Sequence, residues 1–275
     1  MLALVLTAAV ALEPPTATQY YARAIEAMGD VPQPNFATYD VHVHVRGMGF
    51  MLEREPNGKA SIGLGWGSDT RPDASFPAAY RKSDDLTSVL TPQGWGVISS
   101  PVFDPTWNGV NDWMRYGFNG RPDAATALPS PTPDVNALPE IAAVQAMGLA
   151  FYDARDGGAG TCANGDLAHR IHLIARSAPL EHPLTDAVID ERTGRLCAVR
   201  LAMHQSVVAF GYSSTIDLNI ADIDGQSLVN GGSIDIIARA AGFGVKHVTM
   251  TFAYEHFAFP PTLAPDMFPA NPGRM

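Results

Sequence analysis

Positively charged residues are scarce in this chain, and they do not cluster. Of its 275 residues 17% are charged, with 18 Lys and Arg against 28 Asp and Glu, which gives a formal net charge of −10. Nucleic-acid binding depends on clusters of Lys and Arg that face phosphates, and the sequence contains no basic run. The composition therefore argues against a nucleic-acid partner, and the acidic balance mainly favours solubility.

Cysteine is scarce as well. The chain has 2 cysteines, Cys162 and Cys197, and they do not form the Cys-x-x-Cys spacing of a zinc site. No metal site is predicted from them. In an exported protein such a pair can form a disulfide. Two unpaired, partly buried thiols are equally compatible with the sequence, and both interpretations stay open.

The apolar run at the start of the chain is too short to cross a bilayer as a helix. Leu2–Leu12 is followed by Glu13-Pro14-Pro15, and no Cys follows the small residues Ala9-Val10-Ala11. The run resembles the hydrophobic region of a signal peptide with its cleavage site. We therefore expect residues 1–11 to be a signal peptide and residues 12–275 to be one exported, periplasmic domain without a lipid anchor.

Recognisable catalytic motifs are missing. Ser99-Ser100 and Ser213-Ser214 lack the Gly-x-Ser-x-Gly elbow of a nucleophile. The glycine-dense run 63–67 follows a hairpin and does not open a helix, as a dinucleotide site would require. Asp222–Gln226 has too few ligands for a calcium loop and is interpreted as a polar turn. We predict no catalytic residue and no cofactor, and we expect that the protein is not an enzyme.

His42 and His44 lie two residues apart on one face of a predicted strand. A metal site would need a third ligand. Alternation of polar side chains on a solvated strand face explains the pair more simply, so no metal is predicted. A hydrolase built on histidine remains a third hypothesis, and it requires at least three ligands from a set that includes His42, His44, His169, His172 and His204 to converge.

What the sequence does contain is alternation of apolar and polar residues with a period of two. It is clearest in the last third, over 184–190, 195–203 and 245–254, and it also marks 38–46, 166–176, 207–219 and 234–240. This period predicts antiparallel sheet with one face on a core or cavity and the other in water. Asn57-Gly58 predicts a hairpin between 50–54 and 60–66, and Asn230-Gly231-Gly232 predicts a turn.

The remaining elements are a helix and an irregular middle. Residues 16–28 have helical spacing of apolar residues, a capping Thr16 or Thr18, and Gly29-Asp30 as a stop signal. Short elements are expected at 141–147, as a helix, and at 149–155, as a strand. The stretch 67–139 is rich in Pro, Gly and Trp and predicts an irregular aromatic insertion or lid, with 127–133 as an exposed loop.

The chain resembles a known family over 165–268. The stretch His169–Ile174, followed by Pro183–Leu196 with its Thr-containing turn, resembles a characteristic pair of strands of the periplasmic outer-membrane lipoprotein-sorting proteins, the LolA/LolB-like group. Phe252–Pro260 and Asp266-Met267-Phe268 resemble the last strand and tail of that group. The sequence departs from the pattern at Val188, where an aromatic residue is common, and in its longer middle.

The resemblance implies a fold and a ligand. The fold is mainly β (α+β), a curved antiparallel sheet that forms a half-open barrel with covering helices and a Pro/Trp-rich lid, and its apolar cavity holds acyl chains. We therefore expect a monomeric, non-enzymatic carrier of a lipid or of lipoprotein acyl chains, served by a membrane-bound donor or acceptor protein. The alternative is a partner-binding or sensor module without a bound lipid. The residues expected to line the cavity are Phe50, Trp66, Trp95, Trp107, Trp113, Ile171, Leu173 and Phe252.

Overall fold

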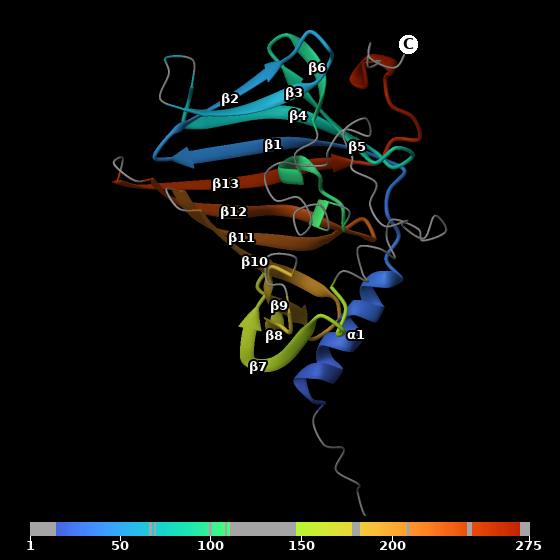
Figure 1. The fold of residues 1–275 in the computed structure, drawn as a ribbon. Helices are drawn as coiled ribbons and strands as arrows, with labels where there is room; N and C mark the ends of the chain where they lie inside the picture. Colours follow the sequence, from blue (N-terminus) through green and yellow to red (C-terminus); the bar gives the residue numbers. More distant parts are fainter. Residues whose placement is uncertain are drawn as a thin grey trace, which may run out of the picture.

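A large open antiparallel sheet dominates the computed structural model, which describes residues 15–65, 68, 70–98, 101–107, 109–110, 147–177, 182–207, 210–240 and 244–269 (Figure 1). The elements within these ranges are α1 (Ala17–Gly29), β1 (Phe36–Arg46), β2 (Gly49–Arg54), β3 (Ala60–Gly65), β4 (Asp73–Arg81), β5 (Leu86–Thr91), β6 (Gly94–Ile98), the 3₁₀ turn η1 (Pro101–Phe103), β7 (Tyr152–Thr161), β8 (Leu167–Ala175), β9 (Leu184–Asp190), β10 (Leu196–Val207), β11 (Phe210–Ile223), β12 (Gln226–Ala240), β13 (Gly244–Ala258) and the 3₁₀ turn η3 (Pro265–Met267).

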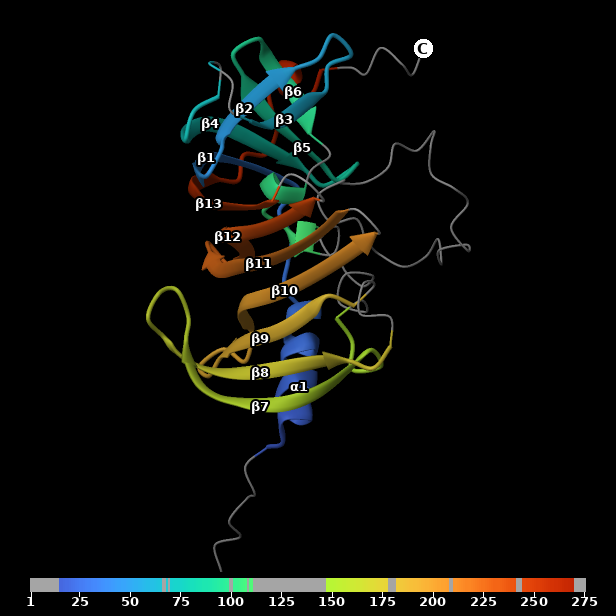
Figure 2. The same ribbon diagram turned by 60° about the vertical axis from the view of Figure 1, so that its left-hand side comes forward.

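The strand order of the main sheet is β6-β5-β4-β1-β13-β12-β11-β10-β9-β8-β7, and each neighbouring pair is antiparallel. The strands β6 and β7 are the two ends of this order, so the sheet is not closed. Figures 1 and 2 show how strongly it twists and curves from one end to the other. Hairpin β2–β3 forms a separate two-stranded sheet. The predicted mainly β fold with a curved, half-open antiparallel sheet is confirmed.

One non-local pairing joins the two halves of the sheet. β1 pairs with β4 on one side, with Val43 opposite Ala74, and with β13 on the other, with Val43 opposite Phe252. The strands on the β4 side follow β1 in the chain after hairpin β2–β3, whereas β13 comes after all the other strands. The β1–β13 pair therefore connects the N-terminal meander to the C-terminal one.

Alternation along the strands separates an inner, apolar face from an outer, polar face. In β1 the residues Tyr39, Val41, Val43 and Val45 are at most 3% exposed, while the residues between them face solvent at least in part. Neighbouring strands continue the inner face with Met250, Phe252, Ile234, Ile216, Leu218 and Leu201. Burial of each such side chain stabilises the fold by roughly 1.5–3 kcal/mol. The apolar residues whose alternation predicts the strands are therefore the same residues that form the core.

Helix α1 covers the inner face at the β7 end of the sheet, where it packs against β7, β9 and β10 (Figure 2). Thr16 caps it: its Oγ1 accepts a hydrogen bond from Gln19 N at 3.3 Å, and Gln19 Oε1 accepts one from Thr16 N at 2.9 Å. Tyr21, Ala24 and Met28 form its buried side, and the Tyr21 hydroxyl donates to the carbonyl of Met147. The predicted helix is confirmed. Across the described part of the chain, no helix combines the length and the apolar character that spanning a bilayer requires.

The prediction of an irregular insertion or lid over 67–139 is wrong for the part that forms β4, β5 and β6. Its Pro and Gly residues lie within strands or in tight turns: Pro77 lies inside β4, and Gly94 adopts φ +109° at the start of β6. Residues 101–110 pack over the inner face as part of the core. Phe103 and Trp107 are buried, Pro105 O accepts from Val229 N at 2.8 Å, and the Tyr39 hydroxyl donates to Phe103 O. The predicted loop 127–133 and most of the predicted helix 141–147 lie outside the described residues.

The predicted turn at Asn230-Gly231-Gly232 is also wrong, because β12 runs through it. The chain reverses instead at Asp224-Gly225, where both residues have positive φ (51° and 81°) and Ile223 pairs with Gln226. This confirms the polar turn expected at 222–226. The glycine at 232 serves packing, since a Cβ there would lie 2.1 Å from Asp217 O.

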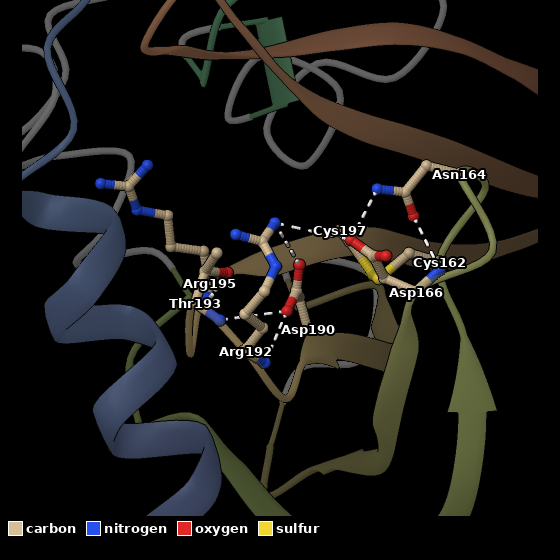
Figure 3. The surroundings of a disulfide bond; sticks show 8 residues. All are labelled: Cys162, Asn164, Asp166, Asp190, Arg192, Thr193, Arg195 and Cys197. Carbon is tan, nitrogen blue, oxygen red and sulfur yellow. Dashed lines mark hydrogen bonds and ion pairs between the residues drawn. A yellow bond between two sulfur atoms is a disulfide. The ribbon is translucent and has the colours of Figure 1, made fainter.

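Cys162 and Cys197 form a disulfide, which resolves the alternative that the sequence left open (Figure 3). It ties the end of β7 to β10 across the two strands between them, and Ala168 and Val188 pack beside it.

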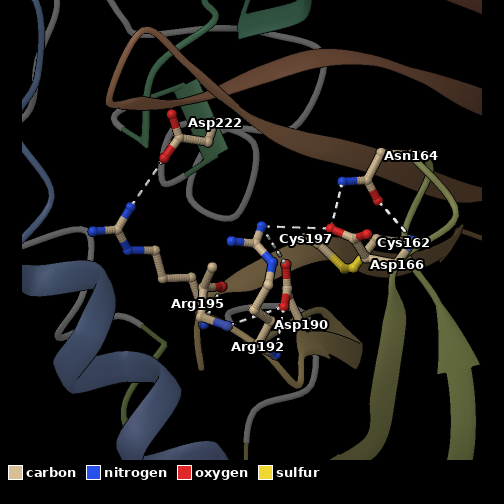
Figure 4. Close-up of polar contacts among 9 residues, drawn as sticks. Cys162, Asn164, Asp166, Asp190, Arg192, Arg195, Cys197 and Asp222 are labelled. Carbon is tan, nitrogen blue, oxygen red and sulfur yellow. Dashed lines mark hydrogen bonds and ion pairs between the residues drawn. A yellow bond between two sulfur atoms is a disulfide. The ribbon is translucent and has the colours of Figure 1, made fainter.

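Polar groups close the turns around this disulfide (Figures 3 and 4). Asp190 Oδ1 accepts hydrogen bonds from the backbone N–H groups of Arg192 and Thr193 at 2.7 and 3.0 Å. Arg195 Nη1 lies 3.3 Å from Asp222 Oδ2, which links the β9–β10 turn to β11. These contacts and the disulfide fix the β7–β10 end of the sheet.

We expect the disulfide to contribute substantially to stability. Its sequence separation of 35 residues corresponds to about 4 kcal/mol of lost chain entropy in the unfolded state. The double variant Cys162→Ser/Cys197→Ser should lose free energy of unfolding on that scale in urea titration, and reduction of the wild-type chain should give the same loss. Equal urea midpoints for the oxidised and reduced chains would contradict this account.

Buried tyrosines should make the fold sensitive to alkali. Desolvation raises the pKa of Tyr21, Tyr39 and Tyr254 well above the usual value, and it raises the pKa of Tyr152 to about 12, partly offset by the N–H of Leu184. Because these folded-state values are raised, their contribution is complete below the unfolded pKa of about 10 and declines as the pH rises toward 12.

The free energy of unfolding should therefore fall steadily above pH about 10. Urea titrations at a series of alkaline pH values measure this, and Tyr152→Phe, which removes one titrating group, should show a shallower decline than wild type. A free energy of unfolding that stays constant through this range would refute the prediction.

Candidate functional site

Among the described residues, part of strand β4 has a strand partner on only one of its edges. On the side away from β1, β4 pairs with β5 only from Ala78 to Arg81. Next to the start of β4, Arg71 exchanges backbone hydrogen bonds with Phe50 of β2, at 2.6 and 3.0 Å. Between these two pairings, residues 73–77 have no strand partner on that side within the described part of the chain. The sheet is therefore interrupted here.

A groove of about 720 Å³ lies in this interruption, between β2, β4 and the β5–β6 turn. Its floor is formed by Phe50 and Phe76, whose rings are nearly parallel with centroids 6.1 Å apart. Half-buried Met51, Leu52 and Leu90 form its walls. The volume lies within the range of about 300–1,000 Å³ that is typical of sites for small ligands.

Backbone and side-chain hydrogen bonds hold hairpin β2–β3 in place against the groove. Arg54 N donates to Gln93 Oε1 at 3.3 Å, and Arg54 Nε donates to Trp95 O at 2.7 Å. Val97 N donates to Gly58 O at 3.0 Å. Together with the Phe50–Arg71 pairing and the burial of Phe50 in the core, these contacts hold the hairpin at the width of the groove.

A second hollow, of about 560 Å³, adjoins the groove on the outer face of β4, β1 and β13. The two share Asp73, Ala74 and Ser75. Polar and apolar groups both line the second hollow: His44 Nδ1 lies 2.7 Å from Asp73 Oδ1, His42 projects nearby, and the small side chain of Ala253 leaves space between the strands. A groove with both apolar and polar walls and a hollow that contains two histidines therefore meet along one short stretch of β4.

The histidines of the outer face pair singly with carboxylates. Besides the pair with Asp73, His172 Nδ1 lies 2.5 Å from Asp186, His247 Nε2 lies 3.1 Å from Asp235, and His256 Nδ1 lies 3.0 Å from Asp40. These pairs belong to lateral rows of polar side chains, one of which runs from β4 to β7 through Asp73, His44, Thr251, Ser233, Asp217, Arg200, Asp186, His172 and Arg155.

The structure does not bring together the histidines that a metal hydrolase would need. His169 faces the inner side, where its ring stacks on Tyr20 of α1 with centroids 4.6 Å apart, while His42, His44 and His172 lie on the outer side. Within the described residues no group of three or more His, Cys, Asp or Glu side chains could hold a metal ion. The polar rows explain His42 and His44 as solvated strand residues.

The residues predicted to line a cavity lie in different surroundings. Phe50 lies on the groove floor, and Trp95 is half-buried in β6. Trp66 and Trp113 lie outside the described residues. Four others are at most 5% exposed and belong to the inner core, namely Trp107, Ile171, Leu173 and Phe252.

The sequence did not identify most of the groove. Met51, Leu52, Phe76 and Leu90 line it beside Phe50. Two features of the sequence could have indicated these residues. One is the apolar run 50–52, and the other is Pro77, since a proline inside a strand indicates a strand at the edge of a sheet.

No protein-family model and no curated protein matches the chain. Among solved structures it is similar to a putative outer membrane lipoprotein-sorting protein domain from Vibrio parahaemolyticus, at 12% identity and a TM-score of 0.37, over 92% of this chain and 97% of that one. A LolA superfamily protein from Nitrosomonas europaea matches at 10% identity and a TM-score of 0.29, over 94% and 99%. A DUF1329 family protein from Desulfovibrio piger matches at 10% and 0.37, over 93% and 98%.

The names of two of these structures belong to the lipoprotein-sorting group that the sequence resembles. At such identities and TM-scores, the likeness says nothing about what this chain binds.

Proposed function

We propose that this protein is an exported, non-enzymatic carrier or binding protein for an amphipathic ligand with hydrocarbon chains, such as a lipid or the acyl chains of a lipoprotein. The observation that carries the proposal is the groove beside β4, which has Phe50, Leu52 and Leu90 in its lining, and its junction with a hollow that contains His42 and His44. A ligand with a hydrocarbon part and a polar part matches this combination of groups.

The hydrocarbon part would lie against Phe50, Leu52 and Leu90. Each methylene group that leaves water contributes about 0.8 kcal/mol, so a chain of several groups would be held without any specific polar contact. A groove that is open to solvent also lets the ligand enter without unfolding the core.

The polar part would lie over the outer face of β4 and β1. There His42, His44 and Thr251 offer N–H and O–H donors and ring-nitrogen acceptors to a headgroup or to a peptide that follows the acyl chains. Directed polar contacts of this kind fix the orientation of a ligand whose binding energy comes mainly from burial.

Release would require a movement of hairpin β2–β3. The hairpin forms its own two-stranded sheet and holds the groove through Arg54 and Gly58. Breaking the hydrogen bonds of Arg54 and Gly58 would let the Arg54 end of the hairpin move away from the groove, while Phe50 stays packed against Phe76 and the main sheet stays intact. We propose that a donor or acceptor protein at the membrane acts at this hairpin.

Export is supported by the disulfide between Cys162 and Cys197, since disulfides persist in oxidising compartments such as the periplasm. The signal peptide proposed for residues 1–11 is the route by which the chain would reach that compartment.

One observation favours the second candidate, a partner-binding or sensor module without a lipid. The inner face is filled by the chain itself, with Trp107, Ile171 and Leu173 all packed into one core. A ligand could reach these residues only by displacing α1 or the 101–110 segment.

Lipid content and uptake decide between these candidates. The full-length protein, purified from a lipid-containing host, would be extracted with organic solvent for mass spectrometry, and the lipid-free protein would be titrated with a fluorescent fatty acyl probe. Co-purified lipid or saturable uptake is expected. Lipid-free protein that also fails to take up the probe would exclude the carrier function.

Replacing an apolar wall of the groove should weaken uptake selectively. Leu52→Asn and Leu90→Asn each remove apolar contact worth up to about 2 kcal/mol, so the dissociation constant of the acyl probe should rise about tenfold. Leu64→Asn is the matched control, because Leu64 is 37% exposed and does not line the groove. Equal affinities for all three variants would place the ligand elsewhere.

A further inference from the structure

The edge of β4 that has no strand partner within the described ranges offers backbone groups that a hydrocarbon ligand cannot satisfy. We infer that residues 73–77 are a docking site for an extended peptide segment of another protein, which adds to the sheet as a strand. This interaction goes beyond the binding of an apolar ligand and does not depend on it.

The direction of the free backbone groups follows from the two pairings beside them. Arg71 exchanges hydrogen bonds with Phe50 on the groove side, whereas Pro72 O accepts from Val45 N on the β1 side, at 2.7 Å. Successive residues of a strand direct their N–H and C=O groups to opposite edges. The N–H and C=O of Asp73 and Ser75 and the C=O of Pro77 therefore point into the groove.

The length of the interruption fits a short strand. It extends from Asp73 to Pro77, between the bridge at Arg71 and the first β5 pair at Ala78. At about 3.3 Å per residue this edge is roughly 17 Å long, which accommodates a peptide of about five residues. Pro77 has no N–H and blocks pairing only at the β5 end of the interruption.

The side chains around this edge indicate which kind of peptide segment would bind. An added strand would direct alternate side chains toward Phe50, Met51 and Leu90, and the remaining ones toward solvent and the charged rim at Glu53 and Arg71. The partner segment is therefore extended, alternates apolar and polar residues, and lacks proline at the pairing positions. Strand addition of this kind derives its affinity from main-chain hydrogen bonds and its specificity from the alternate side chains.

A second copy of this chain fits the site less well. Its own β4 edge is recessed in the same way, between the bridge to β2 and the pairing with β5. Two recessed edges cannot approach to the strand spacing of about 4.8 Å. A free, flexible segment of a different protein meets no such obstacle.

The test uses the oxidised full-length protein, free of lipid, and a fluorescently labelled peptide of alternating Val and Thr. Saturable binding is expected by fluorescence anisotropy. The same peptide with N-methyl groups on alternate amides should bind at least tenfold more weakly, because it cannot pair with the edge. Binding that is equally tight for both peptides, or absent for both, overturns the inference.

Two substitutions of Ser75 give a matched pair of protein variants for the same test. Ser75→Pro removes the N–H that points into the groove, and Ser75→Ala removes the hydroxyl but keeps the N–H. We expect Ser75→Ala to bind the peptide as wild type does and Ser75→Pro to bind at least tenfold more weakly, with matching near-ultraviolet circular dichroism as evidence of intact packing. Equal affinities for the two folded variants contradict the inference.

The two proposals fail separately. Loss of the peptide interaction with intact uptake of the acyl probe rejects the docking site alone, and uptake that is absent while peptide pairing persists rejects the carrier function alone. If Ser75→Pro does not fold, the N-methylated peptide on the wild-type chain still decides the question. Concentration-dependent self-association that Ser75→Pro abolishes would assign the edge to a second copy and overturn the inference.

Discussion

The pairing of β1 with β13 is the contact on which the rest of the structure depends. It brings residues 38–46 against 249–258 and joins the strands around β4 to the long C-terminal meander. Without it, Val41 and Val43 would lose Phe252 and Tyr254 as neighbours, and one apolar face would become two small ones. It also holds β4 in the sheet through β1, so the groove exists only because this non-local pair forms. Such pairs carry a large loop-closure cost, which the continuous core must offset.

Among the described residues, the inner face of the sheet is filled by the chain itself. Helix α1 and residues 101–110 fill it with Tyr21, Phe103 and Trp107. The two hollows described above lie beside β4, where hairpin β2–β3 and β5 leave part of one strand edge unpaired among the described residues. Apolar side chains, two histidines and the backbone groups of this edge meet there. The sheet acts as a rigid support, and the binding chemistry that we propose belongs to one interrupted strand.

Local pattern was enough to predict most elements but not their arrangement. Alternation revealed β1, and Asn57-Gly58 revealed hairpin β2–β3, because these signals act between neighbouring residues. Pro and Gly wrongly indicated irregular structure or a turn at two places: Pro77 lies within strand β4, and Gly231-Gly232 allow close packing inside β12. The groove could not be predicted, since it depends on where β5 stops pairing with β4. Among the residues expected to line a cavity, Phe50 lies in the groove. Ile171 and Leu173 pack into the core instead, because the apolar character that made them cavity candidates also favours their burial.

We propose that ligands bind at the β4 groove and not on the inner face. The most direct measurement is covalent mapping with a photoactivatable fatty acid, bound to the purified oxidised protein, irradiated and analysed by peptide mass spectrometry. The account predicts cross-links in residues 50–53, 73–77 and 90–93, which line the groove. Cross-links concentrated instead on the inner-face residues Tyr21, Ile171 and Leu173 would contradict it.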